Sequence, residues 1–312
     1  MEKSARVSQV TAGPSNGSTV LPVRAHRHPG RWVAAALIAL WAFLVLQSLL
    51  TNPNIGWGTV REYLFAPVTL QGAVVTLYLT AASMVIGVVG GVLIAVMRLS
   101  DNPVMSSVAR VFIWFFRGTP VLVQIIFWGY LGALYPMISI GIPFTDVTLL
   151  SGRTSDIITA PIAALLALGL NEAAYAAEIV RGGVTSIDRG QTEASLSLGL
   201  SPTQTLRRVV LPQAMRVIVP PMGNEVITML KTTALVSVIA GQDLMTVLQR
   251  IYSQNYQVIP LLVVAAIWYL ALTSLLSIPQ AWLERRFGRG HAPTRISVLT
   301  RLTGLRTVKG SE

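Results

Sequence analysis

The chain has 312 residues, of which 53% are hydrophobic and only 12% are charged, and it contains no cysteine. Soluble domains carry about 25% charged residues, so this composition predicts a membrane protein. The lack of cysteine excludes a disulfide framework, a zinc–thiolate centre and a cysteine nucleophile. The net charge of +11 does not indicate nucleic-acid binding by itself, because most of the excess lies in two terminal tails, where the positive-inside rule would put it.

The two tails and the first apolar run give an orientation. Residues 1–31 are polar and rich in Ser, Gly, Pro, Arg and His, which is typical of a disordered tail. The apolar run 32–50 is long enough to cross a bilayer as a helix. The basic residues before this run, and the basic segment 286–312, place both termini in the cytoplasm.

Five more apolar segments follow, which makes six predicted membrane helices in all. In the second helix of the six, Gly87 and Gly91 form a face of small residues that permits close helix contact. Residues 136–159 and 241–258 are expected to be outside loops, and the turn after the fourth span is expected in the cytoplasm. The five further spans are predicted at 68–97, 104–135, 160–181, 213–240 and 258–283. The fold class is therefore an all-α integral membrane protein, a six-span helical bundle.

The polar stretch 188–212 lies between the fourth and fifth spans. Two residue pairs in it have the spacing of a capping box, in which each side chain satisfies a free backbone N–H. Gly199 suits a left-handed helix end, and Pro212 disfavours a helical residue before it. These signals predict two short helices, at 189–198 and 202–210. The capping pairs are Asp188 with Gln191 and Ser201 with Gln204.

The same stretch resembles the "EAA" loop of ABC-importer permeases. One residue departs from the family pattern, since Ser195 stands where a second alanine is usual. The resemblance implies that the first helix is a coupling helix that docks into a groove on a cytoplasmic ATPase subunit. The residues that carry the resemblance or open the loop are Gly190, Gln191, Glu193, Ala194, Gly199, Val209, Leu211 and Pro212.

Two other interpretations of this loop are open. It could be a solvated helical hairpin that only connects two spans. It could also be a helix-turn-helix for DNA, which Arg207 and Arg208 would favour. The apolar spans on both sides argue against DNA binding, because they hold the loop at a bilayer surface.

A second resemblance covers residues 65–285 and is to the permeases for polar amino acids of the histidine/glutamine type. It implies the MetI-like fold of type I ABC importers, with 32–50 as an additional N-terminal helix. The run Lys231-Thr232-Thr233-Ala234 departs from the usual Lys-Asp-Thr-Ser at Thr232 and Ala234. The segments that match are 68–77, 116–124, 174–183, 190–193 and 211–221.

No residue has the setting of a catalytic group. There is no Gly-x-x-x-x-Gly-Lys-Ser/Thr phosphate loop, and the three histidines, His26, His28 and His291, all lie in the tails. The chain is therefore expected to be a transport subunit without a cofactor of its own, and ATP is expected on a separate partner chain.

Polar residues at membrane depth are the candidates for substrate binding, because a charge at mid-bilayer costs about 2.5–3.5 kcal/mol unless it faces a cavity or a partner. Pro220-Pro221 is expected to break the fifth span just before them, as in transporters whose broken helices line a site. Carboxylate, amide and hydroxyl oxygens would accept the ammonium of an amino acid, and a lysine would suit its carboxylate. The alternative is that these groups pair between helices, and it is as strong as the cavity interpretation for Glu172 and Glu178. The candidates are Asn224, Glu225, Thr228, Lys231 and Glu172.

Together these features predict the permease subunit of an ATP-driven importer of polar amino acids in a bacterial plasma or inner membrane. The implied partners are an ATPase dimer, a second permease copy or paralogue, an extracytoplasmic solute-binding protein and the lipid bilayer, with no nucleic acid. Three alternatives are open: an importer of opines, sulfur amino acids or another small zwitterion, an ion-coupled secondary transporter or channel, and a membrane-tethered DNA-binding regulator.

Overall fold

The computed structural model describes residues 29–141 and 148–287. The predicted tails 1–31 and 286–312 therefore lie almost wholly outside the described residues. The chain divides into two parts, which are described separately: residues 1–47 with 293–312, and residues 48–292.

Helix α1 (Pro29–Thr51) forms most of the described portion of the first part. It contains the apolar segment Trp32–Thr51, which is long enough to cross a membrane. This confirms the first predicted helix. The second part begins at Ser48, within the last turn of α1, and continues with a short 3₁₀ turn (Pro53–Ile55) and α2 (Trp57–Leu64).

Three more helices in the described residues are long and apolar enough to cross a membrane alone. They are α3 (Pro67–Leu99), α8 (Ala160–Thr185) and α13 (Val258–Phe287). Two further helix pairs meet the same criterion only as bent units. These are α4 (Pro103–Gly118) with α5 (Val121–Gly129), and the helical run Pro202–Ile239 with α12 (Leu244–Asn255). If each bent pair is one span, the count is six, in approximate agreement with the predicted bundle.

The third predicted span, 104–135, is not one continuous helix. It bends by 97° between α4 and α5, at Thr119 and Pro120, and ends in the short α6 (Leu131–Leu134). Pro120 lacks an N–H and its ring disfavours a helical residue before it, so Thr119 has an extended backbone.

The fifth span corrects two predictions. Pro212 does not end the second hairpin helix, because α10 (Pro202–Thr205) continues through a widened turn (Leu206–Val210) into α11 (Leu211–Thr232). Pro220-Pro221 does not break the helix either. Contacts with α8 and α13 hold α11 in a helical path there. The helix changes later, at Thr233, where a 3₁₀ segment runs to Ile239.

Residues 241–258, predicted as a polar outside loop, are mostly helical, so the prediction of a loop is wrong. They contain α12, whose Leu244, Val247 and Leu248 are buried. These residues repeat at helical spacing, so α12 buries an apolar stripe against α3 and α13. Several polar residues on its other face hid this stripe in the sequence.

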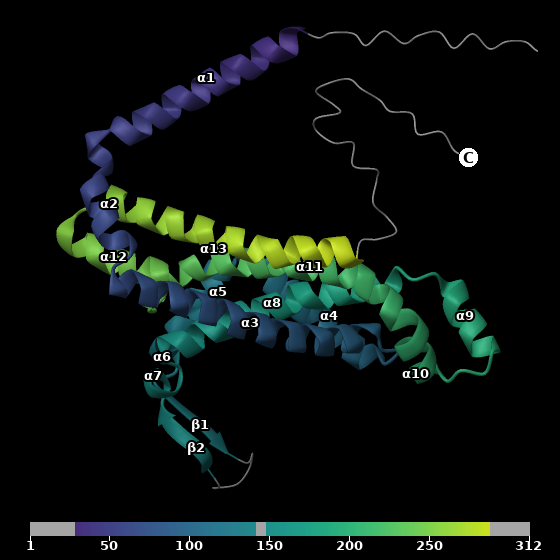
Figure 1. Cartoon of the computed structure of the whole chain (residues 1–312). Coiled ribbons are helices and arrows are strands. Elements are labelled where there is room, and N and C mark those ends of the chain that lie inside the picture. Colours follow the sequence, from purple (N-terminus) through teal and green to yellow (C-terminus); the bar gives the residue numbers. More distant parts are fainter. Residues whose placement is uncertain (1–28, 142–147, 288–312) are drawn as a thin grey trace, which may run out of the picture. The chain divides into compact units, whose positions relative to one another are not determined.

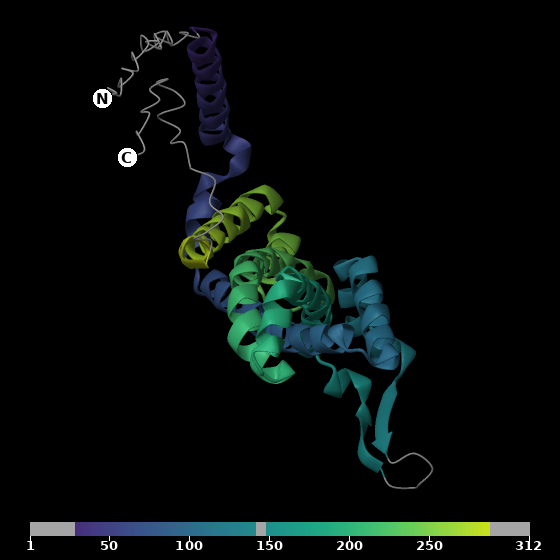
Figure 2. The same cartoon turned by 90° about the vertical axis from the view of Figure 1, so that its right-hand side faces the viewer.

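A small β-hairpin interrupts the helical fold within the predicted outside loop 136–159. Strand β1 (Met137–Gly141) pairs antiparallel with β2 (Thr148–Arg153), from Met137 opposite Arg153 to Ile140 opposite Leu150. Helix α7 (Thr154–Ile157) follows it. Figure 2 shows the two strands standing away from the helices, so the all-α prediction holds for the bundle and not for this loop.

The core of the bundle is the contact between α3 and α8. Gly87 and Gly91 lie in this contact, and a Cβ at either position would overlap Glu172 or Ala176 of α8. The predicted small-residue face is therefore confirmed. Buried alanines of α8, such as Ala167 and Ala173, keep the opposite surface equally flat.

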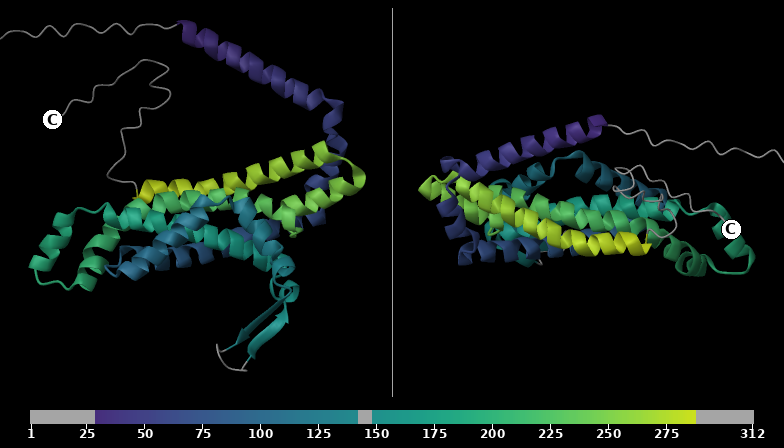
Figure 3. Two further views of the ribbon diagram at one scale, coloured as in Figure 1. Left: turned by 180° about the vertical axis from the view of Figure 1, so that it is seen from behind. Right: turned by 45° about the horizontal axis from the view of Figure 1, so that its top comes forward.

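Two projections mark the ends of the bundle. Helices α9 (Arg189–Ser197) and α10 extend beyond one end of the long helices, and the β-hairpin lies near the other (Figures 1 and 3). The segments 182–212 and 136–159, which are predicted on opposite sides of a membrane, therefore lie toward opposite ends of the long helices.

Candidate substrate cavity and coupling hairpin

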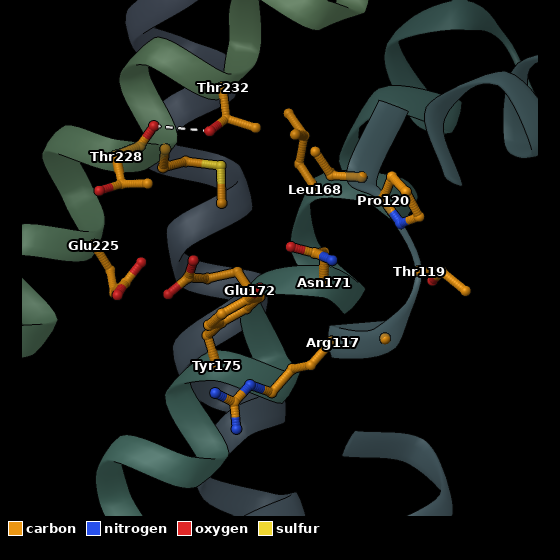
Figure 4. A pocket seen from close by; sticks show the side chains of 13 residues that line it. Arg117, Thr119, Pro120, Leu168, Asn171, Glu172, Tyr175, Glu225, Thr228 and Thr232 are labelled. Carbon is orange, nitrogen blue, oxygen red and sulfur yellow. Dashed lines mark hydrogen bonds between the residues drawn. The ribbon is translucent and has the colours of Figure 1, made fainter. Parts of the chain in front are cut away.

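A cavity of about 530 Å³ lies where the α4–α5 break faces α8 and α11. Figure 4 shows side chains from all three places converging on it. The break contributes Arg117 to Val121, α8 contributes Leu168, Asn171, Glu172 and Tyr175, and α11 contributes Glu225, Thr228, Met229 and Thr232.

The break stays open because two amide side chains bond the carbonyls that it frees. The carbonyl of Phe116 lies four residues before Pro120, which has no N–H to offer it. Asn171 Nδ2 donates to this carbonyl at 2.8 Å and Gln124 Nε2 donates to it at 3.0 Å. Gln124 Nε2 also donates to the Thr119 carbonyl at 3.1 Å and to the Thr119 hydroxyl at 2.8 Å. Hydrogen bonds from Asn171 and Gln124 therefore hold the side of the cavity that the break forms.

Glu172 is the most buried charged side chain of the cavity, with 4% of its surface exposed. Its Oε1 atom is buried and has no hydrogen-bond partner among the described residues. The Cα of Gly87 lies directly behind it, where any side chain would overlap Glu172 Cγ. A buried acceptor without a donor costs about 1–3 kcal/mol or more, so Glu172 Oε1 is an acceptor that the described residues leave unused.

Helix α11 presents one face to the same space. Glu225, Thr228 and Thr232 follow each other at helical spacing, so they share this face. The Thr232 hydroxyl donates to the Thr228 carbonyl at 2.9 Å. Glu225 and Thr228 are therefore the polar side chains that this face contributes to the lining of the cavity (Figure 4).

Arg117 is the cation of the cavity. Its guanidinium carbon lies 5.0 Å from the ring centre of Tyr175, a cation–π distance. Among the residues that the structure describes, Arg117 forms no ion pair with Glu172 or Glu225. The cavity thus brings together two carboxylates and one guanidinium that do not neutralise each other directly.

The predicted substrate residues divide into two groups. Glu172, Glu225 and Thr228 line the cavity, whereas Asn224 and Lys231 are exposed on another face of α11 and do not line it. Glu178 does not reach the cavity, because it pairs with Arg181 of its own helix at 2.8 Å.

Arg117, Asn171 and Tyr175 also line the cavity, although sequence reasoning did not assign them to the substrate site; Asn171 and Tyr175 stand out in the sequence only as polar residues at membrane depth. In the sequence, Arg117 lies in the cytoplasmic half of the third predicted span, where a long side chain is expected to reach the membrane surface, and Pro120 is expected to kink this span as a structural feature. The signal that could have found Arg117 is Pro120 in the middle of an apolar run, which places the residues just before it at a helix break.

The hairpin between α8 and α11 has much of the predicted local structure. Ser201 and Gln204 form the expected capping box, and Gly199 is left-handed with φ of +84°. At the first helix the prediction is wrong in detail. Asp188 accepts from the N–H of Gly190 at 2.6 Å, one residue earlier than a capping box requires. The residues Gly190, Gln191, Glu193 and Ala194 are exposed along α9.

Comparison with known proteins agrees with this arrangement. Residues 87–289 match the family described as the inner membrane component of binding-protein-dependent transport systems. The chain belongs to this family. It is 45% identical to the arginine transport system permease protein ArgU of Corynebacterium glutamicum, over 98% of this chain and 95% of that protein.

Solved structures show the same fold. A crystal structure of an amino acid ABC transporter with histidines is 36% identical to the chain, with a TM-score of 0.59, and the match covers 71% of this chain and 95% of that one. An inward-facing methionine ABC transporter, at 20% identity and a TM-score of 0.52, covers 70% of this chain and 96% of that one. The family and these structures confirm the predicted MetI-like importer fold, and the chain is a transport component that spans the membrane.

Proposed function

We propose that the chain is the permease subunit of an ATP-driven importer of polar amino acids, and that its cavity suits basic amino acids best. The observation that carries this proposal is the charge of the cavity, with two carboxylates, Glu172 and Glu225, and one guanidinium, Arg117. A basic amino acid carries two cationic groups and one carboxylate, which is the complementary set. The 45% identity to an arginine permease supports the same class.

Each charged group has a role in this proposal. Glu172 and Glu225 accept hydrogen bonds from the α-ammonium and the cationic side chain of the substrate. Arg117 leaves the face of Tyr175 and pairs with the α-carboxylate, for which a guanidinium has the right geometry. Thr228 and Asn171 supply neutral polar contacts at the edge of the cavity.

Asn224 and Lys231, also predicted as substrate residues, take a different place in the proposal. They are exposed on α11, and polar groups at membrane depth are costly unless they face water or protein. A second permease copy or paralogue that packs on this face would cover them.

The remaining partners follow from the hairpin and from the missing phosphate loop. A cytoplasmic ATPase dimer binds ATP and docks on α9 through Glu193 and its neighbours, so the chain needs no cofactor of its own. A solute-binding protein delivers the substrate from the other side. ATP binding and release then bias the equilibrium between two conformations of the permease.

The proposal includes an orientation in a bacterial plasma or inner membrane. The hairpin and both termini face the cytoplasm, where the basic tails 1–31 and 286–312 agree with the positive-inside rule. Residues 65–285 form the transport domain, and 32–50 add one helix to it.

The first test measures uptake of radiolabelled arginine, histidine and glutamine in proteoliposomes that contain the permease, the ATPase and the binding protein. Glu225→Gln is compared with Glu62→Gln, since Glu62 is exposed on α2 and far from the cavity lining. Loss of a charged hydrogen bond predicts about 10- to 100-fold less arginine uptake for Glu225→Gln alone. Equal uptake by the two variants would remove Glu225 from the site.

A second test separates the importer from its alternatives. The wild type is expected to co-purify with the ATPase and to transport only with ATP, whereas Glu193→Arg reverses the charge on α9 and loses the association. Uptake driven by an ion gradient without ATPase would support a secondary transporter. Selective uptake of an opine or a sulfur amino acid would keep the importer and change its substrate class.

A further inference from the structure

The connection between the hairpin and α11 is a widened helical turn. The N–H of Leu211 donates to the carbonyl of Leu206, five residues earlier, instead of to a residue four earlier. The helix continues on both sides, through α10 and α11. A single turn of this kind inserts one extra residue into an α-helix and is found most often at functional sites.

Pro212 explains why the turn is widened. Its ring would press on the carbonyl of Arg208, four residues earlier, and it has no N–H to donate to that carbonyl. The wider turn relieves this contact. Gln213 adds a side-chain bond inside the turn, since its Nε2 donates to the Val209 carbonyl at 2.9 Å. Pro212 therefore explains the widened turn, and the hydrogen bond of the Gln213 side chain stabilises it.

A second cavity, of about 360 Å³, lies directly beside this turn, between it, α9 and the end of α8. Thr205, Leu206 and Val210 line it from the turn, and Thr192 and Leu196 line it from α9. Thr205 is only 2% exposed, and its hydroxyl has no hydrogen-bond partner among the described residues. A buried hydroxyl without a partner is unfavourable, so the observed position of this segment is not its best-bonded one.

We propose that the widened turn at 206–210 is a joint that changes its register during transport, so that the hairpin moves relative to α11. The inference rests on the proposed function, because it assigns to this joint the motion that the ATPase drives. The second cavity is the space into which the turn relaxes, and the Thr205 hydroxyl finds its partner in the relaxed state.

The size of the motion follows from helix geometry. Converting the wide turn to regular α-helix removes one inserted residue, which corresponds to about 1.5 Å along the axis and about 100° of rotation. A register change can be shared between the hairpin and α11, so each moves by less. A shift of this size is enough to rearrange a closely packed contact between two subunits.

Pro212→Ala tests the joint, because it restores the N–H that regular α-helix needs. The matched control is Pro221→Ala, a proline inside the same helix but away from the widened turn. We expect Pro212→Ala to lower arginine uptake per ATP hydrolysed by about tenfold, within the usual range of coupling between sites. Pro221→Ala is expected to stay within about twofold of the wild type.

The motion itself can be measured because the chain contains no cysteine. Spin labels on Ser197→Cys of α9 and Arg216→Cys of α11 lie on either side of the joint, and both residues are exposed. Their distance is expected to change when a non-hydrolysable ATP analogue binds the wild-type complex, and to stay constant in Pro212→Ala. An unchanged distance in the wild type would overturn the proposal.

Thr205→Val gives an independent test in a variant that folds, because it replaces a buried, unpartnered hydroxyl by a methyl of the same shape. It is expected to keep or raise the melting temperature and to slow transport several-fold, since the relaxed state loses a hydrogen bond. Thr185→Val, in the same cavity but at the end of α8, is the control. Equal transport by both variants would overturn the role of Thr205.

The outcomes separate this inference from the proposed function. If the wild type fails to bind the ATPase or to transport arginine, the proposed function is wrong. If the wild type transports and Pro212→Ala and Pro221→Ala behave alike, the function stands and the joint is rejected.

Discussion

Two prolines in this chain have opposite effects on the helices that contain them. At Pro120 the helix stops and turns by 97°, whereas at Pro212 it widens by one residue and continues. The difference lies in what satisfies the freed carbonyls. Gln124 and Asn171 donate to the carbonyl of Phe116, four residues before Pro120. Near Pro212 the backbone itself forms a wider turn, in which the N–H of Leu211 donates to the carbonyl of Leu206. The break at Pro120 opens a cavity, whereas the widened turn at Pro212 keeps the helix continuous, so that it can transmit movement.

The largest effect on uptake is expected from a substitution at Gly87, which packs behind Glu172 in the cavity. Gly87→Ala places a methyl group in overlap with Glu172 Cγ and 2.6 Å from Glu172 Cβ, so the Glu172 side chain must move from its present position. Arginine uptake is expected to fall by about 100-fold or more, since a charged contact of this kind contributes up to about 3 kcal/mol. Uptake is measured in proteoliposomes.

Gly118→Ala is the control for this variant, because nothing lies within 4 Å of a Cβ at Gly118 although it also borders the cavity. If Gly87→Ala transports as well as Gly118→Ala, the position of Glu172 does not matter for uptake, and the cavity is not the substrate site.

The next prediction compares the side-chain hydrogen bonds of Gln124 at the break with that of Gln213 at the widened turn. Gln124→Leu removes three hydrogen bonds at the break and is expected to lower the free energy of unfolding by about 2–3 kcal/mol, because buried carbonyls lose a donor. Gln213→Leu removes one bond at the widened turn and is expected to cost about 1 kcal/mol. Thermal unfolding in detergent measures both, and a larger loss for Gln213→Leu would reverse the comparison.

A smaller effect is expected at the tip of the hairpin. Gly199 is left-handed, and nothing lies near a Cβ there, so Gly199→Ala costs only backbone strain, about 1–2 kcal/mol. The hairpin is expected to fray locally while the bundle stays intact. Amide hydrogen exchange at 189–205 checks this, and unchanged protection there would show that the left-handed cap is not needed.

The smallest effect is expected at the stacked pair in the cavity. Tyr175→Leu removes the ring under Arg117 and with it a cation–π contact of about 0.5–1 kcal/mol. The KM for arginine is expected to change by about two- to fivefold, with ATPase activity unaltered. A loss of ATP-driven turnover instead would place Tyr175 in the conformational change and not in binding.

The residues of the cavity differ in how well the sequence alone could predict them. Glu172, Glu225 and Thr228 could be predicted as a group, because polar residues at membrane depth stand out from their apolar neighbours and helical spacing gives their faces. Arg117 and Tyr175 could not, because their contact joins two helices whose relative angle depends on the break at Pro120. Asn224 and Lys231 show the same limit, since a rotation of about 100°, the offset between neighbouring residues of a helix, decides whether a residue faces the cavity.

The sequence by itself determined that this protein crosses a membrane, where the apolar helices lie, which small residues of α3 face a neighbour and where the polar hairpin stands. These are local properties, set by hydropathy, spacing and capping within one segment. Only the tertiary structure decided what each proline does, that α12 is a helix with a buried apolar stripe and not a polar loop, and which charges share the cavity. Those outcomes depend on groups far apart in the chain, such as Asn171 bonding to Phe116, and no single segment contains them.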